Sequence, residues 1–338
     1  MVTAAPELAP EDALRLNVLL AGELQAVRLD EGARTLFGLT PQGEARVPLH
    51  PAGRAERYFQ RVRELLGGHA LGSPEGYPVH LRRWTRMGHA EPKKLEALLK
   101  LGEPEAVLAV AYAPTLTDEL ARRAWWSLPT MEVARVMLGH PAVRAGTMGP
   151  LLSEFLVEHL PFEADPIVAM HTVRAVLAAG LLAPEARAQL WAKGLRRPHY
   201  LIGFLESLPD ALPAEAGRPL PAGLPDTPAA RLLARCFSES GQAWLRAAEL
   251  ALEKPPAHEA VYLLLDLMGA YFAAGRAPAG LEAHPAEAAA LQALSQLSDA
   301  TAEPVLTKTT AIGPLMRRHL EPVFAPILGH IRIMRGMA

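Results

Sequence analysis

The side chain with the greatest potential for chemistry in this 338-residue sequence is its single cysteine, Cys236. It lies in the stretch Arg231-Leu-Leu-Ala-Arg-Cys-Phe-Ser238, whose apolar spacing is typical of a helix. A thiolate with a lowered pKa could carry or transfer sulfur, but such activation usually needs a helix N-terminus or a cationic pocket. Because Cys236 falls in the middle of the predicted helix, the favoured interpretation is a small buried apolar residue. One cysteine also excludes an intrachain disulfide and a four-thiolate zinc site.

Motifs that would indicate catalysis or cofactor binding do not occur. The sequence contains neither of the phosphate-binding loops G-x-G-x-x-G and G-x-x-x-x-G-K-[ST], nor the zinc motif H-E-x-x-H, nor the nucleophile motif G-x-S-x-G. Glu158, His159 and His171 come nearest to a metal-ligand set, but three or four converging ligands are needed, so we interpret them as surface or capping residues. Paired acids such as Asp118 and Glu119 stand at predicted helix starts, where they complement the unpaired amides. We therefore predict no enzyme activity, no metal site and no cofactor.

Two stretches combine arginine with tryptophan and form the predicted interaction surface. The first contributes Arg82, Arg83, Trp84 and Arg86, and the second contributes Arg122, Arg123 and Trp126. A surface that binds nucleic acid or an acidic protein would use this composition. For the first stretch, however, the favoured interpretation is a strand with outward arginines and an inward Trp84. In the second, Trp125 and Trp126 are 100° apart on a helix, so at most one can lie at the centre of the buried face.

Composition limits the classes of partner. The net charge is −2 and the isoelectric point is about 6.6. The chain as a whole therefore lacks the positive net charge that would attract nucleic acid or an anionic membrane. The longest apolar run, 261–275, is shorter than the roughly 20 residues of a membrane span and contains Asp266. Residues 1–12 lack the basic and apolar regions of a secretory signal. We expect a cytoplasmic protein that does not insert into a membrane. Nucleic acid is not a favoured partner.

A long helical stretch organises the chain. Between Pro92 and Pro209 the prolines are mostly nine to fifteen residues apart, and apolar residues at helical spacing fill the intervals. Because proline cannot continue a helix but fits the first turn of the next one, this pattern predicts a train of short helices joined by tight turns. Each helix can bury its apolar face only by stacking on its neighbours. The predicted fold class is mainly α, an irregular α-solenoid-like array of helices with a small N-terminal α+β unit.

The predicted domain organisation has four parts. Residues 1–90 form the α+β unit, with a helix over 11–22, a three-stranded meander over 24–49 and a helix from Gly53 to Leu66 ended by Gly67-Gly68. Residues 91–208 form the helical array, and 209–229 form a proline-rich linker suited to a stiff exposed spacer. Residues 230–338 form a C-terminal helical region, in which the last predicted helix covers 303–320 and an apolar, basic tail follows.

Three of these stretches resemble a known family. They are Glu11-Asp-Ala-Leu-Arg-Leu-Asn-Val-Leu-Leu20, the run from Leu71-Gly-Ser-Pro-Glu-Gly-Tyr-Pro78 into Arg82-Arg-Trp-Thr-Arg-Met-Gly88, and Thr117-Asp-Glu-Leu-Ala-Arg-Arg-Ala-Trp-Trp126. Over residues 11–210 the chain resembles the DsrS family, which accompanies the dissimilatory sulfite reductase system of sulfur-oxidising bacteria. The resemblance implies a cytoplasmic accessory or regulatory part in sulfur oxidation. It supplies no catalytic residues.

We therefore predict a non-catalytic scaffold or regulatory accessory protein of sulfur oxidation that acts through protein–protein contacts. Two alternatives remain open. One is a sulfur-carrying or sulfur-transfer role centred on Cys236, and the other is a regulator that contacts RNA or DNA through Arg82–Arg86. The sequence does not specify the partner or the oligomeric state.

Overall fold

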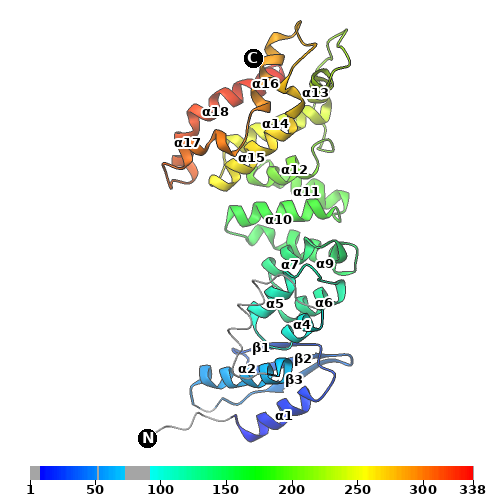
Figure 1. Ribbon diagram of the computed structural model, residues 1–338, viewed down its shortest axis with the longest axis vertical. Helices are drawn as coiled ribbons and strands as arrows, with labels where there is room; N and C mark the ends of the chain where they lie inside the picture. The colour runs from blue at the N-terminus through cyan, green and yellow to red at the C-terminus, as the bar shows by residue number, and fades with distance from the viewer. Residues whose placement is uncertain (1–7, 52, 73–91, 338) are drawn as a thin grey trace. The chain divides into compact units, whose positions relative to one another are not determined.

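The structure is a computed structural model that describes residues 8–51, 53–72 and 92–337 (Figure 1). The chain divides into two compact units, residues 1–156 and 157–338. The boundary falls within helix α9, inside the predicted helical array of 91–208. Each unit is described separately.

Unit 1 begins with a small sheet and its two helices, followed by an array of short helices. Its elements are α1 (Pro10–Leu20), β1 (Ala26–Asp30), β2 (Thr35–Thr40), β3 (Gly43–Pro48), α2 (Ala55–Leu71), α4 (Pro92–Leu98), α5 (Pro104–Ala111), α6 (Asp118–Ser127), α7 (Met131–Leu138), α8 (Pro141–Arg144) and α9 (Met148–His159). In the array α5 packs against α4, α6 and α7, and α7 also contacts α8. Each of these short helices thus has its apolar face covered by neighbouring helices.

The sheet is an antiparallel meander in the order β1-β2-β3. Its register places Leu29 opposite Leu36 and Leu36 opposite Val47. Because side chains alternate between the two faces of a strand, these residues share the face that packs on α1 and α2. Arg28, Phe37 and Arg46 are likewise aligned with one another, on the opposite face.

The end of α2 differs from the sequence prediction. Gly67 and Gly68 do not stop the helix, which continues to Leu71 and ends at Gly72 in the left-handed conformation, with φ of 69°. Gly67 is buried beside Leu66, so the packing of this face keeps the two glycines helical at a cost of about 1 kcal/mol each relative to alanine.

Helix starts follow the sequence signals closely. Pro104, Pro141, Pro166 and Pro184 each occupy the first position of a helix, as predicted from the spacing of the prolines. Thr117 is the N-cap of α6, since its hydroxyl accepts a hydrogen bond from the Leu120 amide at 3.2 Å.

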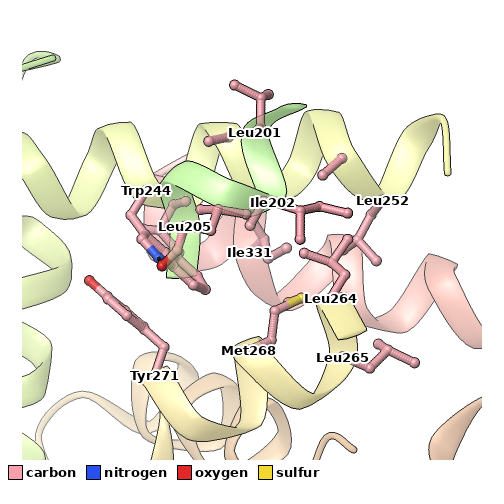
Figure 2. Close-up of a cluster of buried hydrophobic side chains, with 14 of the residues drawn as sticks. Leu201, Ile202, Leu205, Trp244, Leu252, Leu264, Leu265, Met268, Tyr271 and Ile331 are labelled. Atoms are coloured by element: carbon pink, nitrogen blue, oxygen red, sulfur yellow. Dashed lines mark hydrogen bonds between the residues drawn. The ribbon is translucent and has the colours of Figure 1, made fainter. Parts of the chain in front are cut away.

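Unit 2 is a helical assembly with one large core. Its elements are η1 (Leu160–Phe162), α10 (Pro166–Ala179), α11 (Pro184–Gly194), η2 (Pro198–Tyr200), α12 (Leu201–Ser207), α13 (Pro228–Phe237), α14 (Glu239–Glu253), α15 (His258–Tyr271), η3 (Ala273–Arg276), α16 (Pro285–Ser295), η4 (Asp299–Thr301), α17 (Glu303–Leu306) and α18 (Gly313–Arg335). Helix α14 contacts α12, α13, α15 and α18 and is buried along most of its length. Figure 2 shows part of this core, where side chains of α12, α14, α15 and α18 meet around Trp244.

The C-terminal helix was predicted wrongly. Instead of one helix over 303–320 and a tail, the chain forms the short α17 and then α18, which runs through Pro322 and Pro326 to Arg335. Each internal proline removes one backbone hydrogen bond and favours a helix break. Helix α18 nevertheless persists because Phe324, Ile327 and other apolar residues of this stretch are buried in the core of unit 2.

The proline-rich segment, expected as an exposed spacer over 209–229, packs within unit 2. Leu212 is buried in the core. Arg218 donates hydrogen bonds of 2.9 Å to the carbonyls of Ile333 and Met334, and its guanidinium lies 4.0 Å from the ring centroid of Phe237. The segment therefore joins α12 to α13 and also holds the end of α18.

The predicted fold class is confirmed: the chain is mainly helical, with a small three-stranded antiparallel sheet near the N-terminus. Within residues 8–51, 53–72 and 92–337, no helix has both the length and the apolar character needed to cross a bilayer.

Candidate interaction surface

A row of alternating arginine and aromatic side chains crosses the sheet in unit 1 and continues onto α6. We call Arg46, Phe37, Arg28 and Trp126 the arginine–aromatic row. The guanidinium carbon of Arg28 lies 4.6 Å from the ring centroid of Phe37 and 5.1 Å from that of Trp126. The guanidinium carbon of Arg46 lies 5.5 Å from the Phe37 centroid. These distances fall within the range of cation–π attraction, so the four side chains support one another at the surface.

Glu44 neutralises part of the charge of this row. Its carboxylate accepts hydrogen bonds from Arg28 at 3.3 Å and from Arg46 at 3.1 Å. Arg46 remains 71% exposed, while Phe37 and Trp126 are half-buried. The row thus presents arginine and aromatic surface to solvent in a fixed arrangement, because cross-strand register and side-chain pairing both hold it.

The other two candidates on α6 are paired within their own helix. Arg122 donates to both carboxylate oxygens of Glu119 at 2.8 Å, and Arg123 donates to the same carboxylate at 2.8 Å. The hydrogen bond from Arg122 lowers the pKa of Glu119 to about 2, against the opposing effect of burial and with help from Arg123. Arg122 also donates to the side-chain carbonyl of Gln25 at 3.3 Å, which links α6 to the segment before β1.

The two tryptophans of α6 pack against different side chains. Trp125 packs edge-on against Phe155 of α9, with ring centroids 4.7 Å apart. Trp126 packs under Arg28 instead. Both are half-buried, which agrees with the expectation that at most one could lie at the centre of the buried face. Trp126 is therefore the member of the pair that joins the sheet to the helical array.

The remaining candidates, Arg82, Arg83, Trp84 and Arg86, lie outside the described residues. The prediction that they contact a partner or nucleic acid stays a prediction.

A hydrogen-bonded cluster around the fully buried Asp12, which the sequence analysis did not identify, joins three segments of unit 1. Asp12 of α1 accepts from the backbone amide of His50 at 2.7 Å, from His50 Nδ1 at 2.9 Å and from the Tyr58 hydroxyl of α2. Burial alone would raise the pKa of Asp12, but the hydrogen bonds from His50 and Tyr58 outweigh it and lower the pKa. Burial and the bond to Asp12 raise the pKa of Tyr58, so its hydroxyl stays protonated and donates. Positions 12, 50 and 58 have no sequence spacing that would have grouped them.

Cys236 lies on α13 and is fully buried, with 0% of its surface exposed. Burial raises the pKa of its thiol to about 12, and the nearby Arg235 offsets only part of this effect. Arg235 is itself held by two hydrogen bonds to Asp210, at 2.5 and 2.7 Å. These features match the buried apolar interpretation of the cysteine and count against the sulfur-transfer alternative.

We expect native protein to leave Cys236 unmodified by iodoacetamide or by a persulfide donor, with a labelling rate about a hundredfold or more below that of the denatured chain. The reason is that reaction requires both opening of the core and loss of the thiol proton. Intact-mass spectrometry before and after addition of denaturant measures this directly, since each chain carries one thiol. Rapid persulfidation of the native protein would restore the sulfur-transfer alternative.

The weak metal candidates do not come together. His171 Nε2 lies 2.5 Å from Glu259 Oε1, and the ring of His159 packs against Phe162 with centroids 6.5 Å apart. In the part of the chain that the structure describes, no group of three or more His, Cys, Asp and Glu side chains is placed to hold a metal ion.

Sequence reasoning found one end of the arginine–aromatic row and missed the other. Trp126 was selected because it stands beside two arginines, whereas Arg28, Phe37 and Arg46 are spread over three strands. The alternation of polar and apolar residues within each predicted strand was visible in the sequence. Only the pairing register of the strands, however, aligns Arg28, Phe37 and Arg46. A scan against protein-family models and searches of curated proteins and of solved structures found no match to this chain.

Proposed function

We propose that this chain is a non-catalytic cytoplasmic accessory protein of sulfur oxidation, a scaffold or regulator that works by contacting other proteins. The single observation that carries the proposal is the arginine–aromatic row of unit 1. Arginine, tryptophan and phenylalanine are enriched in the energetically important centres of protein interfaces. Here they are aligned and half-exposed on a rigid sheet and helix.

The sulfur-oxidation context rests on the resemblance of residues 11–210 to the DsrS family. The burial of Cys236 supports contact rather than sulfur transfer as the mode of action. A half-buried arginine–aromatic surface supports a protein partner because aromatic rings bury large areas on binding, and the cation–π contacts already restrict the arginines before a partner arrives.

The test is affinity purification of the tagged full-length chain from cells grown on reduced sulfur compounds. We expect a specific protein to co-purify with the wild type and to be reduced about tenfold by Arg46→Glu, which reverses an exposed charge of the row. The matched control is Arg57→Glu, an exposed arginine on α2, the helix that covers the opposite face of the sheet. Recovery of no partner above background, or equal recovery with Arg46→Glu, would contradict the proposal.

A further inference from the structure

Strand β3 lies at an open edge of the sheet in unit 1. The strand order β1-β2-β3 leaves one side of β1 and one side of β3 without a neighbouring strand. The free side of β1 is used in part, because the Val27 amide donates to the carbonyl of Leu99 at 2.8 Å. An unpaired edge presents backbone donors and acceptors in a row, with which another strand can pair. Strand β3 thus offers a place for one additional strand.

The strand register identifies the backbone groups on the free side of β3. The Leu49 amide donates to the carbonyl of Arg34 at 2.8 Å, so these two positions form a hydrogen-bonded pair at the end of the ladder. Hydrogen-bonded and non-hydrogen-bonded pairs alternate along an antiparallel ladder. Glu44, Arg46 and Pro48 therefore turn their backbone groups away from β2. All three present a carbonyl, but only Glu44 and Arg46 present an N–H, because proline has none.

These backbone groups are open to solvent. Glu44 is exposed as a residue although its side chain is only 28% exposed, so its main chain contributes much of the exposed surface. Arg46 and Pro48 are exposed as well. Within residues 8–51, 53–72 and 92–337, no backbone group bonds to the outward amides and carbonyls of these three residues. An incoming strand would therefore displace only water.

The side chains of β3 fit a second copy of the same strand. When two β3 strands pair in antiparallel orientation with Ala45 opposite the partner's Ala45, Glu44 lies opposite the partner's Arg46 and Arg46 lies opposite the partner's Glu44. Opposite charges at directly paired positions stabilise a sheet. Each of these two pairs also exchanges two backbone hydrogen bonds, since the outward amides and carbonyls of Glu44 and Arg46 face one another.

Other registers are disfavoured. A slip of two residues in either direction places Glu44 opposite the partner's Glu44 or Arg46 opposite the partner's Arg46, and like charges directly opposite one another destabilise a sheet. A slip of four residues places Arg46 opposite the partner's Pro48, which cannot donate. A slip of one residue requires backbone groups that already bond to β2. Charges and a proline protect a sheet edge against indiscriminate pairing, and here they leave one register that satisfies both charges and both amides.

We propose that two copies of this chain associate by antiparallel pairing of their β3 strands in this register. The three strands of each copy then form one continuous sheet of six. Because paired residues lie on the same face, the two arginine–aromatic rows come to lie on one face of this sheet. A contact along one short strand is at the small end of protein interfaces, so the dimer is weak and depends on concentration. The inference does not rest on the proposed function.

The test is sedimentation velocity of the purified full-length protein at increasing micromolar concentrations. Glu44→Arg and Arg46→Glu each turn both attractive pairs into repulsive ones, because the two pairs are related by symmetry. The double variant Glu44→Arg/Arg46→Glu makes the paired charges opposite again. The matched control is Arg57→Glu, an exposed arginine on α2, which covers the other face of the sheet. Circular dichroism verifies that each variant is folded.

We expect the wild type and the control to form dimers as concentration rises. Each single variant should raise the dimer dissociation constant about tenfold or more, and the double variant should return it to within about threefold of the wild type. Hydrogen exchange over residues 43–48 should slow with concentration in the wild type only where dimers form. A wild type that stays monomeric, association that survives both single variants, or a folded double variant that associates no better than they do overturns the inference. The proposed function would still stand, because no partner protein enters this experiment.

Discussion

Trp244→Ala should lower the free energy of unfolding of unit 2 by about 3–5 kcal/mol. Trp244 is fully buried in the core shown in Figure 2. Its ring stacks on Tyr271 with centroids 3.8 Å apart and meets Phe272 edge-on at 5.7 Å. Its Nε1 donates to the carbonyl of Leu205 at 3.3 Å, which links α14 to α12. Alanine removes all of these contacts and leaves a cavity beside Leu205, Tyr271 and Phe272.

Hydrogen exchange with mass spectrometry under native conditions is the appropriate measurement, because it reports stability segment by segment in a chain with two units. The matched control is Trp244→Phe, which keeps an aromatic ring and loses the hydrogen bond, and it should cost about 1–2 kcal/mol. Faster exchange should be found in α12, α14 and α15. A loss below about 1 kcal/mol for Trp244→Ala would mean that this core is not packed as the structure describes.

Asp12→Ala should destabilise unit 1 by about 2–4 kcal/mol at neutral pH. The substitution removes the acceptor for His50 and leaves the hydroxyl of the buried Tyr58 without its partner. Because Asp12 joins α1, the segment after β3 and α2, its loss should speed hydrogen exchange in all three. The matched control is Glu11→Ala, the neighbouring acid in the same helical turn. Its carboxylate is 80% exposed, and the change should cost less than about 0.5 kcal/mol.

The stabilisation by Asp12 should also depend on pH, in a direction set by its pKa. That pKa is lowered in the folded protein, since hydrogen bonds from His50 and Tyr58 overcome the effect of burial. The unfolded chain therefore binds the proton first as pH falls below about 5, and stability decreases through the folded pKa. The difference between wild type and Asp12→Ala should be complete at pH 7 and shrink towards about pH 3. A difference that stays constant over this range would show that the carboxylate charge is not what stabilises the cluster.

The helices of this protein could be predicted because their signals are local. The first-turn prolines at 104, 141, 166 and 184 and the cap at Thr117 act through their own backbone geometry, which neighbouring segments need not supply. The strands were predictable for a similar reason, since alternating apolar residues can face only one side of a sheet. The cap at Asp165, which accepts from the Ile167 amide at 2.8 Å, is of the same local kind.

Where local signals and burial conflicted, burial prevailed. The pair Gly67-Gly68 and the prolines 322 and 326 are helix breakers by propensity, yet both stretches are helical. Breaking a helix at these places would expose apolar side chains such as Leu66 and Ile327, and each buried side chain of this size contributes about 1.5–3 kcal/mol. The propensity costs, about 1 kcal/mol for each glycine and about 3 kcal/mol for each proline, are offset by several such residues. A single sequence does not show how many of these residues are buried.

The candidate sites divide in the same way. The sequence alone determined that the chain is helical, that its one cysteine falls within a helix, and that Trp126 stands near two arginines. These features could be predicted because they depend on residues that are close together in the sequence. Only the tertiary structure decided that Cys236 is sealed in a core, that Asp12 meets His50 and Tyr58, and that Arg28 lies between Phe37 and Trp126. These contacts join residues between 9 and 98 positions apart, and strand register and helix packing, which arise only when the whole chain folds, bring them together.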